Sequence, residues 1–67
     1  MHPVVSSNLK AVGYNPAKQV LYVEFNSGST YAYLDVPEKR ALGLISAESK
    51  GSYFAEFIKD AYSFVKG

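Results

Sequence analysis

The stretch STYAYLDVP, residues 29–37, decides the fold because a strand pattern changes to a helix pattern within it. Tyr31 and Tyr33 lie two positions apart, which is the spacing of side chains on one face of a strand. Pro37 then suits the first position of a helix, and Asp35 is available nearby as a cap. The question for function is whether the two rings lie in the core or on a surface where a ligand stacks.

The chain before this stretch predicts an antiparallel meander. Residues 9–14 are apolar, and they end at the turn signal Asn15-Pro16. Residues 19–25 are rich in β-branched and aromatic side chains, and residues 29–34 follow after a short link. We therefore expect three strands joined by short connections.

The chain after Pro37 changes to the period of a helix. Ala41, Leu44 and Ile45 share one face of a short helix. Gly43 lies inside this helix and weakens it, because glycine is a poor helix former.

A second and longer helix is predicted to run from Lys50 or Ser52 to Phe64, with Ser49 or Ser52 as its cap. The order β-β-β-α-α predicts an α+β domain, in which two helices cover one face of a three-stranded antiparallel meander. We expect residues 9–66 to form this single domain and residues 1–8 to precede it as a tail. The apolar stripe of the second helix consists of Phe54, Phe57, Ile58, Ala61, Tyr62 and Val65.

The second predicted strand has one apolar face and one wetter face. Leu21, Val23 and Phe25 share the first, whereas the charge of Glu24 marks the second. The face of Leu21 is therefore the predicted core face.

The length of the next hairpin loop decides where the two tyrosines point, because a shift of one residue inverts the faces of a strand. A two-residue loop pairs Phe25 with Thr30 and leaves both rings outward. A three-residue loop that ends at Gly28 pairs Phe25 with Ser29 and turns both rings inward. Glycine at the end of such a loop is a recurrent hairpin solution, so we favour the second alternative.

The composition excludes several classes of function. The chain has 67 residues, enough for one domain, and it has no cysteine, which excludes disulfide scaffolds and thiol catalysis. Its single histidine is His2, so we expect no metal site and no cofactor. The net charge of +1 is not the basic excess of a protein that coats nucleic acid. The sequence shows no signal peptide or membrane span, so we expect a cytoplasmic protein without membrane contact.

Several short motifs follow one another along nearly the whole chain. They are Ser6-Ser7, Gly13-Tyr14, Leu21-x-Val23-x-Phe25, Gly28, Tyr31-x-Tyr33, Val36-Pro37, Ser49-Lys50-Gly51 and Tyr53-Phe54. This ordered set resembles the KTSC domain, which is named for its place at the C-terminus of some lysyl-tRNA synthetases and also occurs as a small separate protein in bacteria and phages. Ala32 and Ala55 depart from the family, which often has a polar residue and Asn at these places.

The family is described as of unknown function, and RNA binding is proposed for it because of its attachment to synthetases, so the resemblance extends that expectation to this chain. A role in tRNA charging does not carry over, because no synthetase body accompanies this chain. The residues themselves do not favour an enzymatic function. Glu56 and Asp60 are spaced as an acid–base pair on the second helix, but with Lys59 they are typical of a solvated helix face.

Lys50, Gly51 and Ser52 form the best candidate for an anion site. They open a predicted helix, where free N–H groups favour negative charge, and Lys50 adds a cation. Capping and a turn between the two helices explain the same residues. Both interpretations stay open at the level of sequence.

RNA binding needs stacking rings beside cations. Tyr22 is predicted to lie outward, and Lys10 is among the basic residues that could surround a ligand. Tyr31 and Tyr33 join this surface only if the hairpin has the two-residue loop, which turns both rings outward. Core packing and ordinary surface charge explain the same residues.

The outer sheet face is the basis of a different hypothesis. Val20, Tyr22, Ala32 and Leu34 make it apolar, and such a face is often a partner surface. The sequence thus favours a non-enzymatic module that binds RNA, a nucleotide or another phosphate-bearing ligand. The alternative is a homo-oligomer or a protein–protein module, such as a phage protein that captures a nucleotide or a host protein, with no nucleic-acid binding.

Overall fold

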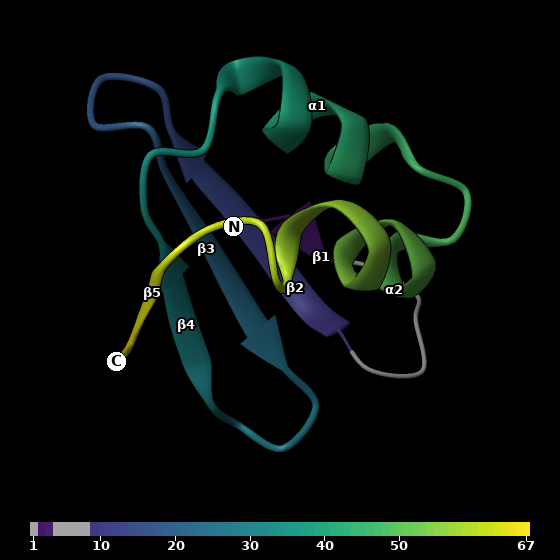
Figure 1. Ribbon diagram of the computed structural model, residues 1–67. Coiled ribbons are helices and arrows are strands. Elements are labelled where there is room, and N and C mark those ends of the chain that lie inside the picture. Colours follow the sequence, from purple (N-terminus) through teal and green to yellow (C-terminus); the bar gives the residue numbers. More distant parts are fainter. Residues whose placement is uncertain (1, 4–8) are drawn as a thin grey trace.

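The chain folds into a sheet of antiparallel strands with its helices on one face (Figure 1). This computed structural model describes residues 2–3 and 9–67. In these residues the sheet has five strands in sequence order: β1 (His2–Pro3), β2 (Leu9–Asn15), β3 (Val20–Phe25), β4 (Thr30–Tyr33) and β5 (Phe64–Lys66). The helical part consists of α1 (Glu38–Ser46), α2 (Lys50–Tyr53) and the π-helix η1 (Phe54–Ile58). The predicted α+β class is confirmed, and so is the meander of β2, β3 and β4.

The β3–β4 hairpin has the three-residue loop, which settles where the tyrosines point. Gly28 adopts φ 94°, its N–H donates to the Phe25 carbonyl at 2.9 Å, and the Phe25 N–H donates to the Ser29 carbonyl at 2.9 Å. Tyr31 lies opposite Val23 and Tyr33 opposite Leu21. Both rings are therefore on the inner face, as the loop chemistry predicted.

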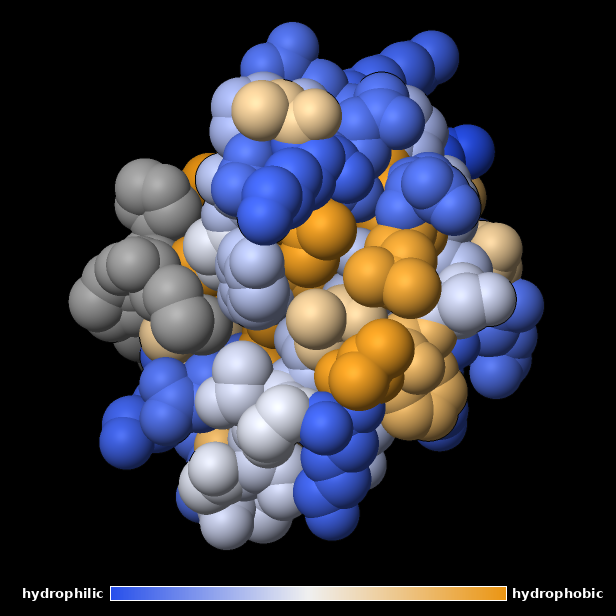
Figure 2. Space-filling view, turned by 90° about the vertical axis from the view of Figure 1, so that its left-hand side faces the viewer, coloured by the Kyte–Doolittle hydropathy of each residue, from blue (hydrophilic) through white to orange (hydrophobic). Residues whose placement is uncertain are grey.

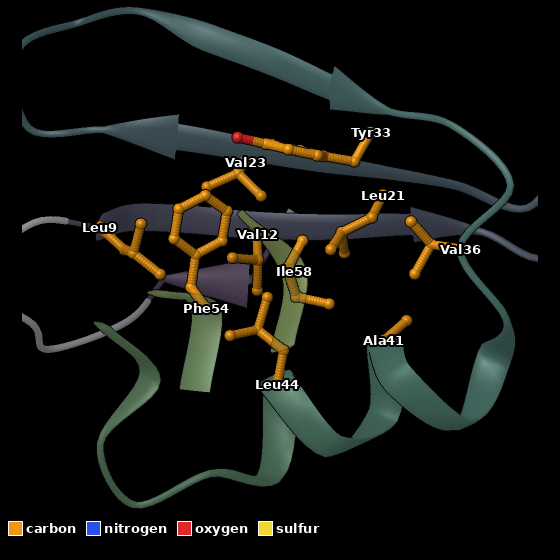
Figure 3. Close-up of a cluster of buried hydrophobic side chains, with 10 residues drawn as sticks. All are labelled: Leu9, Val12, Leu21, Val23, Tyr33, Val36, Ala41, Leu44, Phe54 and Ile58. Carbon is orange, nitrogen blue, oxygen red and sulfur yellow. The ribbon is translucent and has the colours of Figure 1, made fainter. Parts of the chain in front are cut away.

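The core lies between the inner sheet face and the helices. Tyr33 is 2% exposed, and Figure 3 shows its ring among the aliphatic side chains of the strands. The Tyr14 hydroxyl donates to the Val36 carbonyl and ties the segment before α1 to β2. The buried set is Leu9, Val12, Leu21, Val23, Tyr33, Val36, Ala41, Leu44, Phe54 and Ile58.

The second helix is shorter than predicted. It ends at Ile58 rather than Phe64, and the chain then turns back to the free edge of β4. The yellow C-terminal strand lies beside β4 in Figure 1. Leu34 N–H donates to the Ser63 carbonyl at 2.8 Å, and Gly67 N–H donates to the Thr30 carbonyl at 2.8 Å. These backbone hydrogen bonds outweigh the helical spacing of residues 61–65.

The N-terminal segment also adds to the sheet. His2 lies opposite Val12 and Pro3 opposite Ala11, so part of the predicted tail is an edge strand. Residues 4–8 of that tail lie outside the described residues.

Of the predicted helix caps, Ser49 is confirmed in its position and Asp35 is wrong. Pro37 occupies the N-cap position of α1 rather than its first turn, and Asp35 has φ 57°. Ser49 is the N-cap residue of α2, but its hydroxyl donates to the Ser52 hydroxyl at 3.0 Å rather than to the helix backbone. Neither α1 nor α2 receives a side-chain cap from the described residues.

The sheet face away from the helices carries an apolar patch. Gly13, Tyr22, Ala32 and Val65 form one row across β2–β5. Tyr22 is 36% exposed and Val65 is 56% exposed. Figure 2, in which the left-hand side of Figure 1 faces the viewer, shows apolar side chains near the centre and hydrophilic ones around them.

Candidate functional site

A groove runs between the α2–η1 segment and the sheet edge formed by β4 and β5. Its volume is about 560 Å³. Polar residues of the β3–β4 hairpin loop contribute to the lining, and Gly51 contributes from α2. Most of the apolar lining comes from the aromatic residues Phe25, Tyr31, Tyr33, Phe54 and Phe64.

The rings of this groove pack against one another and hold their positions. Tyr31 and Phe64 stack with centroids 5.1 Å apart and an angle of 14° between their planes. Tyr33 lies 5.3 Å from Phe64, and Phe25 meets Tyr31 edge-on at 5.2 Å. Phe64 is 50% exposed although it belongs to this cluster. The cluster therefore offers an ordered aromatic surface to a ligand rather than a closed core.

Charged groups of both signs lie at the groove. Lys59 and Asp60 line it from the turn after η1. The Lys66 ammonium lies 6.0 Å from the centre of the Tyr31 ring. Burial raises the pKa of the Tyr33 phenol above its ordinary value, and interactions with Tyr31 and Asp60 raise it further. The Tyr33 hydroxyl is thus a protonated hydrogen-bond donor at neutral pH.

The π-helical turn explains why Lys59 and Asp60 reach the groove. The Lys59 N–H donates to the Phe54 carbonyl at 2.9 Å, a bond five residues long. A π turn takes up one more residue than an α turn, so the side chains after it are shifted around the axis. Phe54 and Ile58 stay buried, and the two charged residues follow at the groove.

The structure brings three of the predicted site residues together. Tyr31, Tyr33 and Gly51 all line the groove, although the tyrosines are inward and not on the outer sheet face. Sequence reasoning missed Phe64, because it placed this residue in a helix. The strand-forming pair Phe64-Val65 was the signal that could have found β5.

The other predicted site residues lie apart from the groove lining. Tyr22 is on the outer sheet face, and the Lys10 ammonium pairs with Glu24 at 3.9 Å. The Lys50 ammonium donates to the Ala47 carbonyl at 2.9 Å. Ser52 is exposed in α2, which spans four residues. These side chains do not form one surface with Tyr31 and Tyr33.

A second aromatic cluster lies between α1 and the α2–η1 segment. The Arg40 guanidinium is 4.8 Å from the centre of the Phe57 ring. Neighbouring Tyr53 and Tyr62 hydroxyls raise the pKa of Arg40. Tyr53 in turn packs 4.7 Å from Phe57. This cluster joins the helices to one another.

The described part of the chain contains neither a metal-binding cluster nor a helix that could span a membrane. Residues 2–3 and 9–67 contain no group of three or more His, Cys, Asp or Glu that could hold a metal ion. None of the helices in these residues is long and apolar enough to cross a membrane.

Comparison with known proteins identifies the family. The KTSC domain matches residues 5–62, which is most of the chain. This chain belongs to the KTSC family. A crystal structure of a KTSC domain protein from Yersinia pestis superimposes with a TM-score of 0.95 at 38% identity, and it covers 98% of this chain and 93% of that one. The resemblance seen in the sequence is thereby confirmed.

KTSC relatives occur both alone and inside larger proteins. A protein of Tsukamurella paurometabola is 40% identical over 65 residues, with 97% of both chains covered. A lysine–tRNA ligase of Nostoc sp. is 45% identical over 58 residues, which are 87% of this chain but 10% of the ligase. The family match ends at Tyr62, so β5 and its Phe64 lie beyond it.

Proposed function

We propose that this KTSC domain is a non-enzymatic module whose aromatic groove binds single-stranded RNA. A base packs on the exposed ring of Phe64, and the phosphates lie near Lys59 and Lys66. The observation that carries the proposal is a half-exposed ring, ordered by stacking on Tyr31, with two cations beside it. Ring stacking with nearby cations is how proteins hold unpaired bases.

The net charge of +1 gives little long-range attraction to a phosphate backbone, so local contacts in the groove must supply the affinity. One further point supports this proposal. Lysine–tRNA ligases, which act on an RNA, contain a segment similar to this chain. We place the binding in the cytoplasm, where such RNAs are found.

The test is a fluorescence anisotropy titration of a labelled single-stranded RNA decamer at low and at high salt. Stacking of one base is worth about 1–3 kcal/mol, so Phe64→Ala should weaken binding by about fivefold or more. The matched control is Leu42→Ala, because Leu42 is 54% exposed on α1 and does not line the groove. Absence of binding at high micromolar RNA, or equal losses in both variants, would contradict the proposal.

The outer sheet face supports a second candidate function, self-association. Val65 and Tyr22 are exposed on it, and burial of this patch would add to the stability of a small domain. Sedimentation velocity over a range of protein concentrations tests this. We expect a dimer that dissociates in the Val65→Ser variant and persists in the Leu42→Ser variant. A monomer at every concentration would contradict self-association.

A further inference from the structure

We propose that the groove selects guanine and that the Asp60 carboxylate is the group that reads it. This inference rests on the proposed RNA binding and adds the identity of the base. Asp60 lines the same groove as Phe64, and it lies close enough to Tyr33 to interact with its phenol electrostatically. The acceptor and the stacking surface are therefore parts of one site.

The chemistry of the base edges gives the preference. A carboxylate has two oxygens that accept hydrogen bonds and no proton to donate. Guanine has two adjacent donors, N1–H and the N2 amino group, on its Watson–Crick edge. Adenine and cytosine offer one donor beside an acceptor, and uracil offers one donor between two acceptors. Guanine is thus the base that gives both Asp60 oxygens a donor.

The Asp60 carboxylate is free to make this contact. Among residues 2–3 and 9–67 the one ion pair joins Lys10 and Glu24, so no cation holds the Asp60 carboxylate. Asp60 is exposed and follows the π-helix, whose last turn holds Lys59 by a backbone hydrogen bond. The backbone before Asp60 is thereby ordered, and its side chain keeps its hydrogen-bonding capacity for a ligand.

Charge at the groove distinguishes a nucleotide from an arginine side chain. A guanidinium group is also planar and also donates two parallel hydrogen bonds to a carboxylate. Lys59 at the groove and Lys66 beside Tyr31 repel such a cation. The same two lysines attract the phosphates that accompany a guanine base. Two cations and one carboxylate therefore favour the nucleotide.

The experiment compares four labelled RNA pentamers, UUGUU, UUAUU, UUCUU and UUUUU, by fluorescence anisotropy with the intact chain. A bidentate contact to a base is worth about 1–3 kcal/mol of discrimination, so UUGUU should bind about fivefold or more tighter than the others. Asp60→Asn keeps the shape but replaces one acceptor by a donor, and it should reduce the preference to less than about twofold. Glu56→Gln is the matched control, because it removes one exposed negative charge from η1 outside the groove lining.

The outcomes separate this inference from the proposed function. Equal affinity for all four pentamers overturns guanine selection and leaves RNA binding in place. Binding of none overturns both. A guanine preference that Asp60→Asn retains, or that Glu56→Gln removes equally, refutes the role of Asp60. An arginine-rich peptide that binds the groove more tightly than UUGUU would show that the carboxylate serves a protein ligand.

Discussion

Replacement of Gly43 should destabilise the protein, although glycine inside a helix is usually unfavourable. A Cβ added at this position would lie 2.7 Å from Cζ of the Tyr53 ring and closer still to its hydroxyl oxygen. Ordinary carbon contacts are about 3.5–4.0 Å, so the Tyr53 ring must shift. That shift disturbs its packing on Phe57 and its contact with Arg40. The glycine is thus present to admit the ring.

The two effects on stability have opposite signs. Alanine in place of glycine favours a helix by about 1 kcal/mol. Overpacking costs about 1–3 kcal/mol, so Gly43→Ala should lower the free energy of unfolding by about 1 kcal/mol. With Tyr53→Ala the obstruction is gone, and Gly43→Ala should then raise the free energy of unfolding by about 1 kcal/mol. The reversal of sign identifies the contact.

Urea unfolding of the four proteins, followed by circular dichroism, measures this double-mutant cycle. We expect a coupling of about 2 kcal/mol between positions 43 and 53. If Gly43→Ala stabilises the protein equally with tyrosine and with alanine at position 53, the packing of α2 on α1 described above is wrong.

Three further predictions concern the hairpin, the core and the tyrosine. Gly28→Ala should lower the free energy of unfolding in urea by about 1–2 kcal/mol, because φ 94° strains an L-residue even though a Cβ would meet nothing within 4 Å. Gly28→Asn should lower it less, and equal stability of all three proteins would contradict this backbone strain. Ile58→Ala should cost about 2–5 kcal/mol and Ile58→Val about 0.5–1.5 kcal/mol, since this side chain is fully buried, and a loss below these ranges would place it outside the core. Burial and the interactions with Tyr31 and Asp60 raise the pKa of the Tyr33 phenol, so the folded state favours the neutral phenol. The stability that this phenol contributes is fully present below its ordinary pKa of 10.0 and is lost as pH rises through the raised pKa. Urea unfolding as a function of pH should show this loss in the original protein and not in Tyr33→Phe.

Local turn chemistry was enough to predict the inner face of the sheet. Gly28 identifies the three-residue loop, the loop sets the register, and the register places Tyr33 in the core. The meander and α1 follow from hydrophobic periodicity in the same way. These features depend on residues that are close together in the sequence.

The end of the second helix could not be predicted in this way. Ala61, Tyr62 and Val65 continue a helical stripe, yet the chain leaves the helix after Ile58 and pairs with β4. Periodicity does not report the free edge of a strand that lies about thirty residues earlier in the sequence. Local spacing and non-local pairing compete here, and the pairing determines the structure.

The groove depends on that pairing, so sequence alone could not assemble it. Phe64 reaches Tyr31 because β5 lies beside β4, and Asp60 reaches the same groove through the turn after η1. The sequence did single out Tyr31, but as a residue that would bind a ligand only on the outer face. The structure gives it a different role, as the inner ring on which the exposed Phe64 stacks.

The most direct test of the account is an NMR measurement of intermolecular nuclear Overhauser effects with UUGUU bound. We expect contacts between the guanine base protons and the ring protons of Phe64, together with shifts at the Lys59 and Asp60 amides. Contacts from the base to Tyr22 on the outer sheet face, with Phe64 unaffected, would contradict the account.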